Sequence, residues 1–128
     1  MSTGDTNEQT PSIVEDATAI YDATRAINHA TIFRPDGLPA PVVYTVLGNL
    51  KSGSGFGLEQ ALRQLASGLK ESLEHYDVYE DDGRDPAQSV AIATEALTEA
   101  AACAAKIGKL LSAAQNAIAG QGFRRNGD

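Results

Sequence analysis

Two histidines, His29 and His75, are the side chains best suited to acid–base or metal chemistry in this chain. A histidine can act as a general base near neutral pH, and neighbouring amide and hydroxyl groups can orient what it acts on. His29 directly follows Asn28, and Tyr44 could add a hydroxyl donor. Asn28, His29 and Tyr44 are therefore the predicted polar site. The alternative is structural: Asn28 and His29 hydrogen-bond the end of a helix, and Tyr44 packs at the edge of the core.

No metal ion or other cofactor is expected at either histidine. Metal ligands on one helix recur three or four residues apart. His29 has Arg25 and Phe33 at that spacing, and His75 has Glu71 alone. The spacing therefore predicts no metal site.

Two loops resemble ligand-binding sequences but lack the residues that define them. The glycines of 51–57 precede a helix as in a phosphate loop, but Leu58 stands where such a loop needs lysine. In the acidic run 79–85, a calcium loop would need an oxygen ligand at Val78 and a glutamate at Ser89. We predict a flexible connector at 51–57 and a solvated acidic loop at 79–85.

The single cysteine, Cys103, lies between alanines in the middle of a predicted helix. A catalytic thiol needs a base or a helix N-terminus beside it, so we interpret Cys103 as a packing residue. The chain also lacks a recognisable set of nucleophile, base and orienting group. The sequence thus predicts no catalytic residue and favours a non-enzymatic protein.

Composition excludes several classes of partner. The 128 residues carry a formal net charge of -7, and the basic residues are scattered apart from Arg124 and Arg125. Direct nucleic-acid binding needs a clustered positive surface, so it is not expected. The polar start of the sequence does not resemble a signal peptide, and no apolar run approaches the ~20 residues that span a bilayer. We expect no membrane contact and a cytoplasmic location.

Helical periodicity and breaker residues set the expected elements. Ser12 and Glu15 form a capping box, and Asp85 with Pro86 is a typical helix start. In chain order we predict a disordered leader 1–11, helix 13–32, a turn at 34–41, a short helix to 50, helix 58–76, helix 86–119 and a flexible tail 120–128.

The last helix carries the longest apolar stripe: Val90, Ala93, Leu97, Ala101, Ala104, Gly108, Leu111, Ala114 and Ile118. Helix 58–76 has the stripe Leu58, Leu62, Leu65, Leu69, Leu73 and Tyr76. The last helix would be roughly 50 Å long and helix 58–76 under 30 Å. Either the short helix stacks end to end with helix 58–76, or a second copy covers the difference. We predict an all-α fold, an antiparallel bundle of three long helices and one short helix over 12–119.

Three segments together resemble a family of small uncharacterised actinobacterial helical proteins. They are AINHAT at 26–31, VYTVLGNL at 43–50 and LEQALRQL at 58–65. The resemblance covers about residues 15–118. It implies a helical fold but no activity and no catalytic residue.

We expect a non-enzymatic interaction or regulatory bundle that self-associates or binds a protein partner through its long helix. The expected interaction face is Leu97, Ala101, Ala104, Gly108 and Leu111. One alternative is a small-molecule-binding or enzymatic bundle that uses His29. Another is an accessory factor that contacts a DNA-binding partner rather than DNA.

Overall fold

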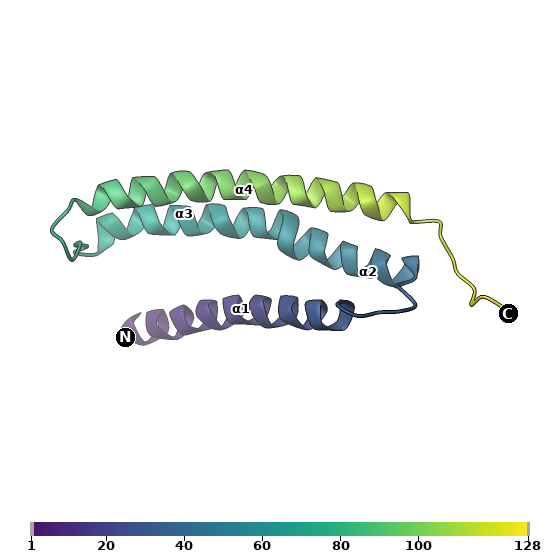
Figure 1. Cartoon of the computed structure of the whole chain (residues 1–128). Coiled ribbons are helices and arrows are strands. Elements are labelled where there is room, and N and C mark those ends of the chain that lie inside the picture. The colour runs from purple at the N-terminus through teal and green to yellow at the C-terminus, as the bar shows by residue number, and fades with distance from the viewer. Residues whose placement is uncertain (1, 128) are drawn as a thin grey trace. The chain divides into compact units, whose positions relative to one another are not determined.

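The computed structural model describes residues 2–127, and all the elements among them are helical, with no strand. The all-α prediction is therefore confirmed. The chain divides into two compact units, Met1–Leu38 and Pro39–Asp128 (Figure 1). The two units are described separately here, and the single bundle over 12–119 stays a prediction.

The first unit is one long helix followed by a turn. Helix α1 runs Ser2–Thr31, so it includes residues 2–11 of the predicted disordered leader, and Ser12 lies inside the helix rather than at its cap. Met1 lies outside the described residues. A polar segment offers no stripe of apolar side chains to bury, but its backbone can still form the hydrogen bonds of a helix. After α1, the amide of Gly37 donates to the carbonyl of Arg34 at 2.9 Å, which closes the predicted turn.

The second unit begins with three helical elements that follow one another without a break. They are α2 (Ala40–Leu50), the π-helix η1 (Lys51–Phe56) and α3 (Gly57–His75). The prediction of a flexible connector at 51–57 is wrong, because this glycine-rich segment is helical. Its wider turns are closed by bonds five residues apart, such as that from the amide of Gly57 to the carbonyl of Ser52.

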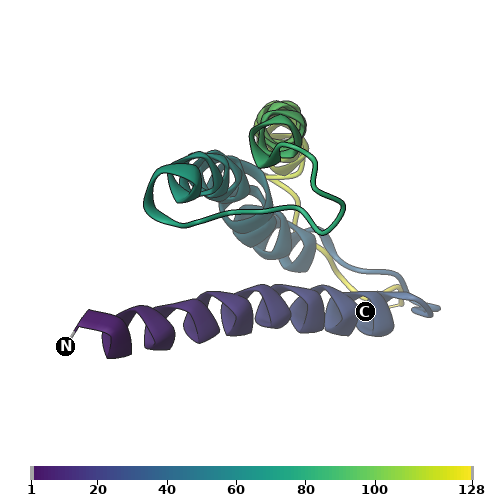
Figure 2. The ribbon, with the colours of Figure 1, turned by 90° about the vertical axis from the view of Figure 1, so that its left-hand side faces the viewer.

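Helix α4 (Pro86–Ala117) lies along all three of these elements (Figures 1 and 2). The carboxylate of Asp85 accepts from the amide of Ala87 at 3.0 Å, which confirms the predicted cap. Helices α2, η1 and α3 have 11, 6 and 19 residues, and α4 has 32. The short helix therefore stacks end to end with α3 through η1, and the three elements together match the length of α4.

The run α2–η1–α3 and helix α4 form a hairpin with two arms that run in opposite directions. The arms pack against each other along one narrow strip of residues, which we call the seam. Near its end, α4 places Gln115 beside Tyr44 of α2; in its middle, Gly108 lies against Gly55 of η1. The buried positions of α4 follow a three-and-four spacing typical of coiled coils. They are Val90, Thr94, Ala101, Ala104, Gly108 and Gln115.

This seam corrects parts of both predicted stripes. On α4, the buried residues are Thr94 and Gln115 rather than their neighbours Ala93 and Ala114. On α3, Ala66 is buried, whereas the predicted core residue Leu65 is 53% exposed. Polar side chains can occupy seam positions when they find hydrogen-bond partners, which an apolar pattern alone does not anticipate.

Candidate interaction surface

The three residues of the predicted polar site lie on different units. Asn28 and His29 occupy the last turn of α1 and are exposed. Tyr44 lies on α2, where its backbone carbonyl accepts a hydrogen bond from Gln115 Nε2 at 3.1 Å. Tyr44 thus has an observed structural role through its backbone, and a polar site that combines it with His29 stays a prediction.

The predicted interaction face is not a free surface. Ala101 and Ala104 are 0% and 2% exposed, Gly108 is also buried, and Leu97 and Leu111 are partly buried. These five residues form the seam between α4 and the other arm of the hairpin. The correction has a simple cause: the chain uses its most regular apolar stripe for its own packing.

One side of this hairpin is polar. Each residue of an α-helix is rotated about 100° from the one before, so the residue after each seam position lies on one flank. Lys70, Ala91, Glu95 and Thr98 are such residues, and they line a single shallow hollow between α3 and α4. The flanks that follow the seam on both helices therefore meet on the same side of the hairpin.

The residues before the seam positions must consequently share the opposite side. We call this the apolar face, because it contains no charged side chain. On α3 it comprises Ala61, Leu65, Gly68 and Ser72, and on α4 it comprises Ala93, Ala96, Ala100, Cys103, Ile107, Leu110 and Ala114. Ile107 and Leu110 are 44% and 59% exposed, so about half of each large apolar side chain is accessible to solvent on this face.

Sequence reasoning missed this face although its signal was present. Helix α4 carries two apolar stripes, each with a three-and-four spacing. One follows the seam positions, and the other follows the positions one residue before them. In an alanine-rich helix the two stripes merge into one wide apolar arc, wider than a single partner helix can cover. Recognising two stripes would have predicted a second apolar surface beside the seam.

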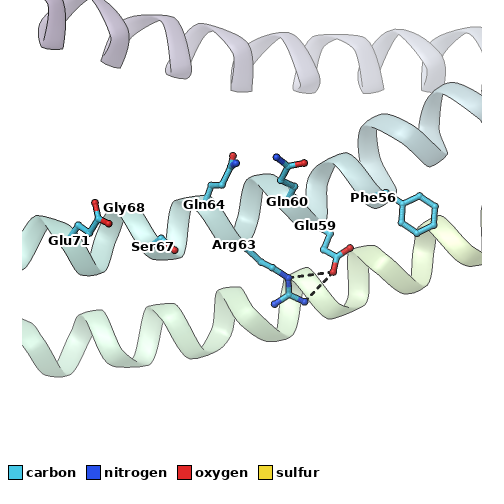
Figure 3. A pocket seen from close by; sticks show the side chains of 8 residues that line it. All are labelled: Phe56, Glu59, Gln60, Arg63, Gln64, Ser67, Gly68 and Glu71. Atoms are coloured by element: carbon cyan, nitrogen blue, oxygen red, sulfur yellow. Dashed lines mark hydrogen bonds and ion pairs between the residues drawn. The ribbon is translucent and has the colours of Figure 1, made fainter.

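A second hollow lies on the outer side of α3 (Figure 3). Within it Arg63 and Glu59 form an ion pair at 3.2 Å, and Gln60 and Gln64 point away from α4. Both charged groups are substantially exposed, so their pairing adds little to stability. We interpret this hollow as a solvated helix surface.

The acidic loop makes local contacts within itself and with the first turn of α4. Asp82 pairs with Arg84 at 2.6 Å, and the hydroxyl of Ser89 donates to the carboxylate of Glu80. Asp85 caps the helix, as described above. Within the described residues no three His, Cys, Asp or Glu side chains cluster in a way that could hold a metal ion.

None of the described helices is both long and apolar enough to cross a membrane. Compared with protein-family models, curated proteins and solved structures, the chain shows no match. The resemblance to the actinobacterial helical family accordingly stays a prediction, and the functional proposal below rests on the surface of the hairpin.

Proposed function

We propose that the protein is a non-enzymatic interaction module whose binding surface is the apolar face of the α3–α4 hairpin. The observation that carries this proposal is the pair of large side chains Ile107 and Leu110, which stay exposed beside a seam that is already filled. Fully burying one such side chain contributes about 1.5–3 kcal/mol. Because both side chains are already about half buried, a partner that covers the face would gain about half of this energy from each.

The distribution of charged residues also supports the apolar face as the binding surface. The chain carries a net charge of -7, yet the apolar face has no ionisable group other than the thiol of Cys103. Interfaces are typically depleted of charged residues at their centre and surrounded by a polar rim. The opposite side, with Lys70 and Glu95, has the composition of a solvated surface.

Covering this face would also complete a bundle. A helical hairpin buries only one stripe of each helix, and a third or fourth helix is needed to enclose a wider core. The antiparallel bundle predicted from the sequence would achieve this with α1, whose apolar residues Ile13, Ile20 and Ile27 recur every seven residues. We propose instead that another polypeptide supplies the covering helices.

Photo-crosslinking distinguishes these arrangements. A benzophenone amino acid is placed in the full chain at Ala96, on the apolar face, or at Ala102, on the polar side of the same helix. Both positions are exposed alanines, so they form a matched pair. We expect adducts to another polypeptide from position 96 and not from position 102 when the chain is irradiated in cells of its source.

Two results would overturn the proposal. One is an equal yield of adducts from the two positions, which would show that the apolar face is not preferred. The other is a crosslink from position 96 to α1 of the same chain, which would show that the face is covered internally.

A further inference from the structure

We infer that α2 is a strap, a segment that opens from α4 as a unit about the glycine-rich part of η1 while α3 and α4 stay packed. This inference goes beyond the proposed function, because it concerns a motion within the hairpin rather than its partner. The loop 76–85 joins α3 to α4 and closes one end of the hairpin. Helix α2 lies at the other end, where the chain enters the hairpin and leaves it (Figure 1). Segments at such an open end separate at lower cost than segments beside a closing loop.

Little apolar packing holds α2 in place. None of its residues is buried, and Val42 and Tyr44 are 46% and 39% exposed. In the rest of the same arm, η1 places Gly55 in the buried seam and α3 places Ala66 there. Few buried apolar contacts mark the segments of a protein that open at the lowest cost. Helix α2 is therefore the part of this arm that should open first.

The helical conformation of α2 also depends on its contact with α4. Four of its residues have β-branched side chains, which lower helix propensity: Val42, Val43, Thr45 and Val46. Its N-cap residue is Pro39, which offers no side-chain acceptor to the first amides of the helix. Once separated from α4, α2 would lose helical structure together with its contacts, so it should open cooperatively.

The glycines of η1 supply a hinge between α2 and the rest of the arm. Gly55 is held in place, because a Cβ atom there would lie 2.6 Å from the Cα of Gly108. Two residues nearer to α2, Gly53 has nothing within 4 Å of the position of a Cβ atom. Glycine also gains more conformational freedom on leaving a helix than any other residue. The segment that opens therefore ends between Gly53 and Gly55.

Gln115 holds the closed strap. Its Nε2 donates to the carbonyl of Tyr44 and its Oε1 accepts from Lys51 Nζ, so both bonds lie on the α2 side of the hinge. A Cβ atom on Gly48 would lie 2.8 Å from this Nε2, so α2 approaches the amide closely. Opening would uncover Gln115 and, one turn further along, the partly buried Ile118. Water can replace both hydrogen bonds in the open state, so the closure is reversible.

Native-state hydrogen exchange of the full chain tests the strap. The amides of 44–50 are compared with those of 62–73 at increasing concentrations of urea below the unfolding transition. We expect the α2 amides to be protected about tenfold less than the α3 amides and to respond more weakly to urea, because the local opening exposes little surface. Equal protection and equal urea dependence in the two segments would overturn the inference, since the arm would then open only as a whole.

Two alanine substitutions test the position of the hinge. Gly53 and Gly68 both lie in helical segments with nothing within 4 Å of their Cβ positions, so alanine fits at each. Gly53→Ala should slow the exchange of the α2 amides about fivefold, because alanine favours the helical state of the hinge. Gly68→Ala is the matched control and should leave the opening of α2 unchanged, because residue 68 stays helical in both states. Equal effects of the two substitutions on α2 exchange, including no effect of either, would contradict a hinge in η1.

Discussion

Gly55 and Gly108 bring the backbones of η1 and α4 into direct contact. A Cβ atom on Gly55 would lie 2.6 Å from the Cα of Gly108 and 2.9 Å from its nitrogen. A Cβ on Gly108 would in turn lie 2.8 Å from the ring of Phe56. Gly55 has no room for a side chain, because the added atom would meet backbone, whereas a side chain at Gly108 would have to displace the Phe56 ring. This crossing fixes where the π-helix lies against α4.

Gly55→Ala should therefore destabilise the hairpin, by about 1–3 kcal/mol, because the methyl group would force two backbones apart. Gly53→Ala lies in the same π-helix with nothing within 4 Å of its Cβ. That control should gain up to about 1 kcal/mol from the better helix propensity of alanine. Urea unfolding followed by circular dichroism measures both. Equal stability of the two variants would show that the close crossing does not exist in solution.

Gln115 should hold α2 against α4. Its Nε2 donates to the carbonyl of Tyr44 at 3.1 Å, and its Oε1 accepts from Lys51 Nζ at 3.0 Å. Gln115→Ala removes both bonds at a buried site and should cost about 1–3 kcal/mol. Asn116→Ala, at the exposed neighbouring position, should change stability by less than about 0.5 kcal/mol. Hydrogen exchange of the α2 amides locates the effect, and unchanged exchange in Gln115→Ala would contradict it.

The start of α4 was predictable from local chemistry, and its cap can be tested directly. Asp85→Ala removes the acceptor for the amide of Ala87 and should cost about 1 kcal/mol. Asp81→Ala, in the same acidic loop, caps no helix and serves as the control. Thermal unfolding at fixed protein concentration compares the two. A larger loss in Asp81→Ala would mean that the loop stabilises the helix through its charge rather than through the cap.

Predictions from the local sequence were confirmed where a single capping or turn residue determines the backbone conformation. Pro86 and Asp85 fix the start of α4, and the turn at Gly37 uses a positive φ of 72° that favours glycine. The π-helix could not be predicted in this way, because glycine and serine are poor helix formers by themselves. What makes the segment helical is its contact with Gly108, far away in the sequence, and tertiary packing overrides such propensities.

The surface was harder to predict than the fold. A stripe such as Leu97 and Ala101 indicates which residues seek a partner, but not whether the partner is the same chain or another one. The structure assigns that stripe to the hairpin and leaves Ile107 and Leu110 outside it. For Asn28, His29 and Tyr44, the sequence contained no signal that would bring two separate units to one site.

The seam defines how α4 is rotated about its own axis against the other arm of the hairpin. Ala101 is completely buried, whereas its neighbour Ala102 is exposed on the polar side. Ala101→Leu should destabilise the hairpin by about 1–3 kcal/mol, since three added carbon atoms have no space between the helices. Ala102→Leu adds the same atoms to solvent and should stay within about 0.5 kcal/mol of the parent. Denaturant unfolding at one fixed concentration compares the variants. If Ala102→Leu were the more damaging, α4 would be rotated about its axis relative to this structure, and the positions assigned to the seam and the apolar face would both shift by one residue.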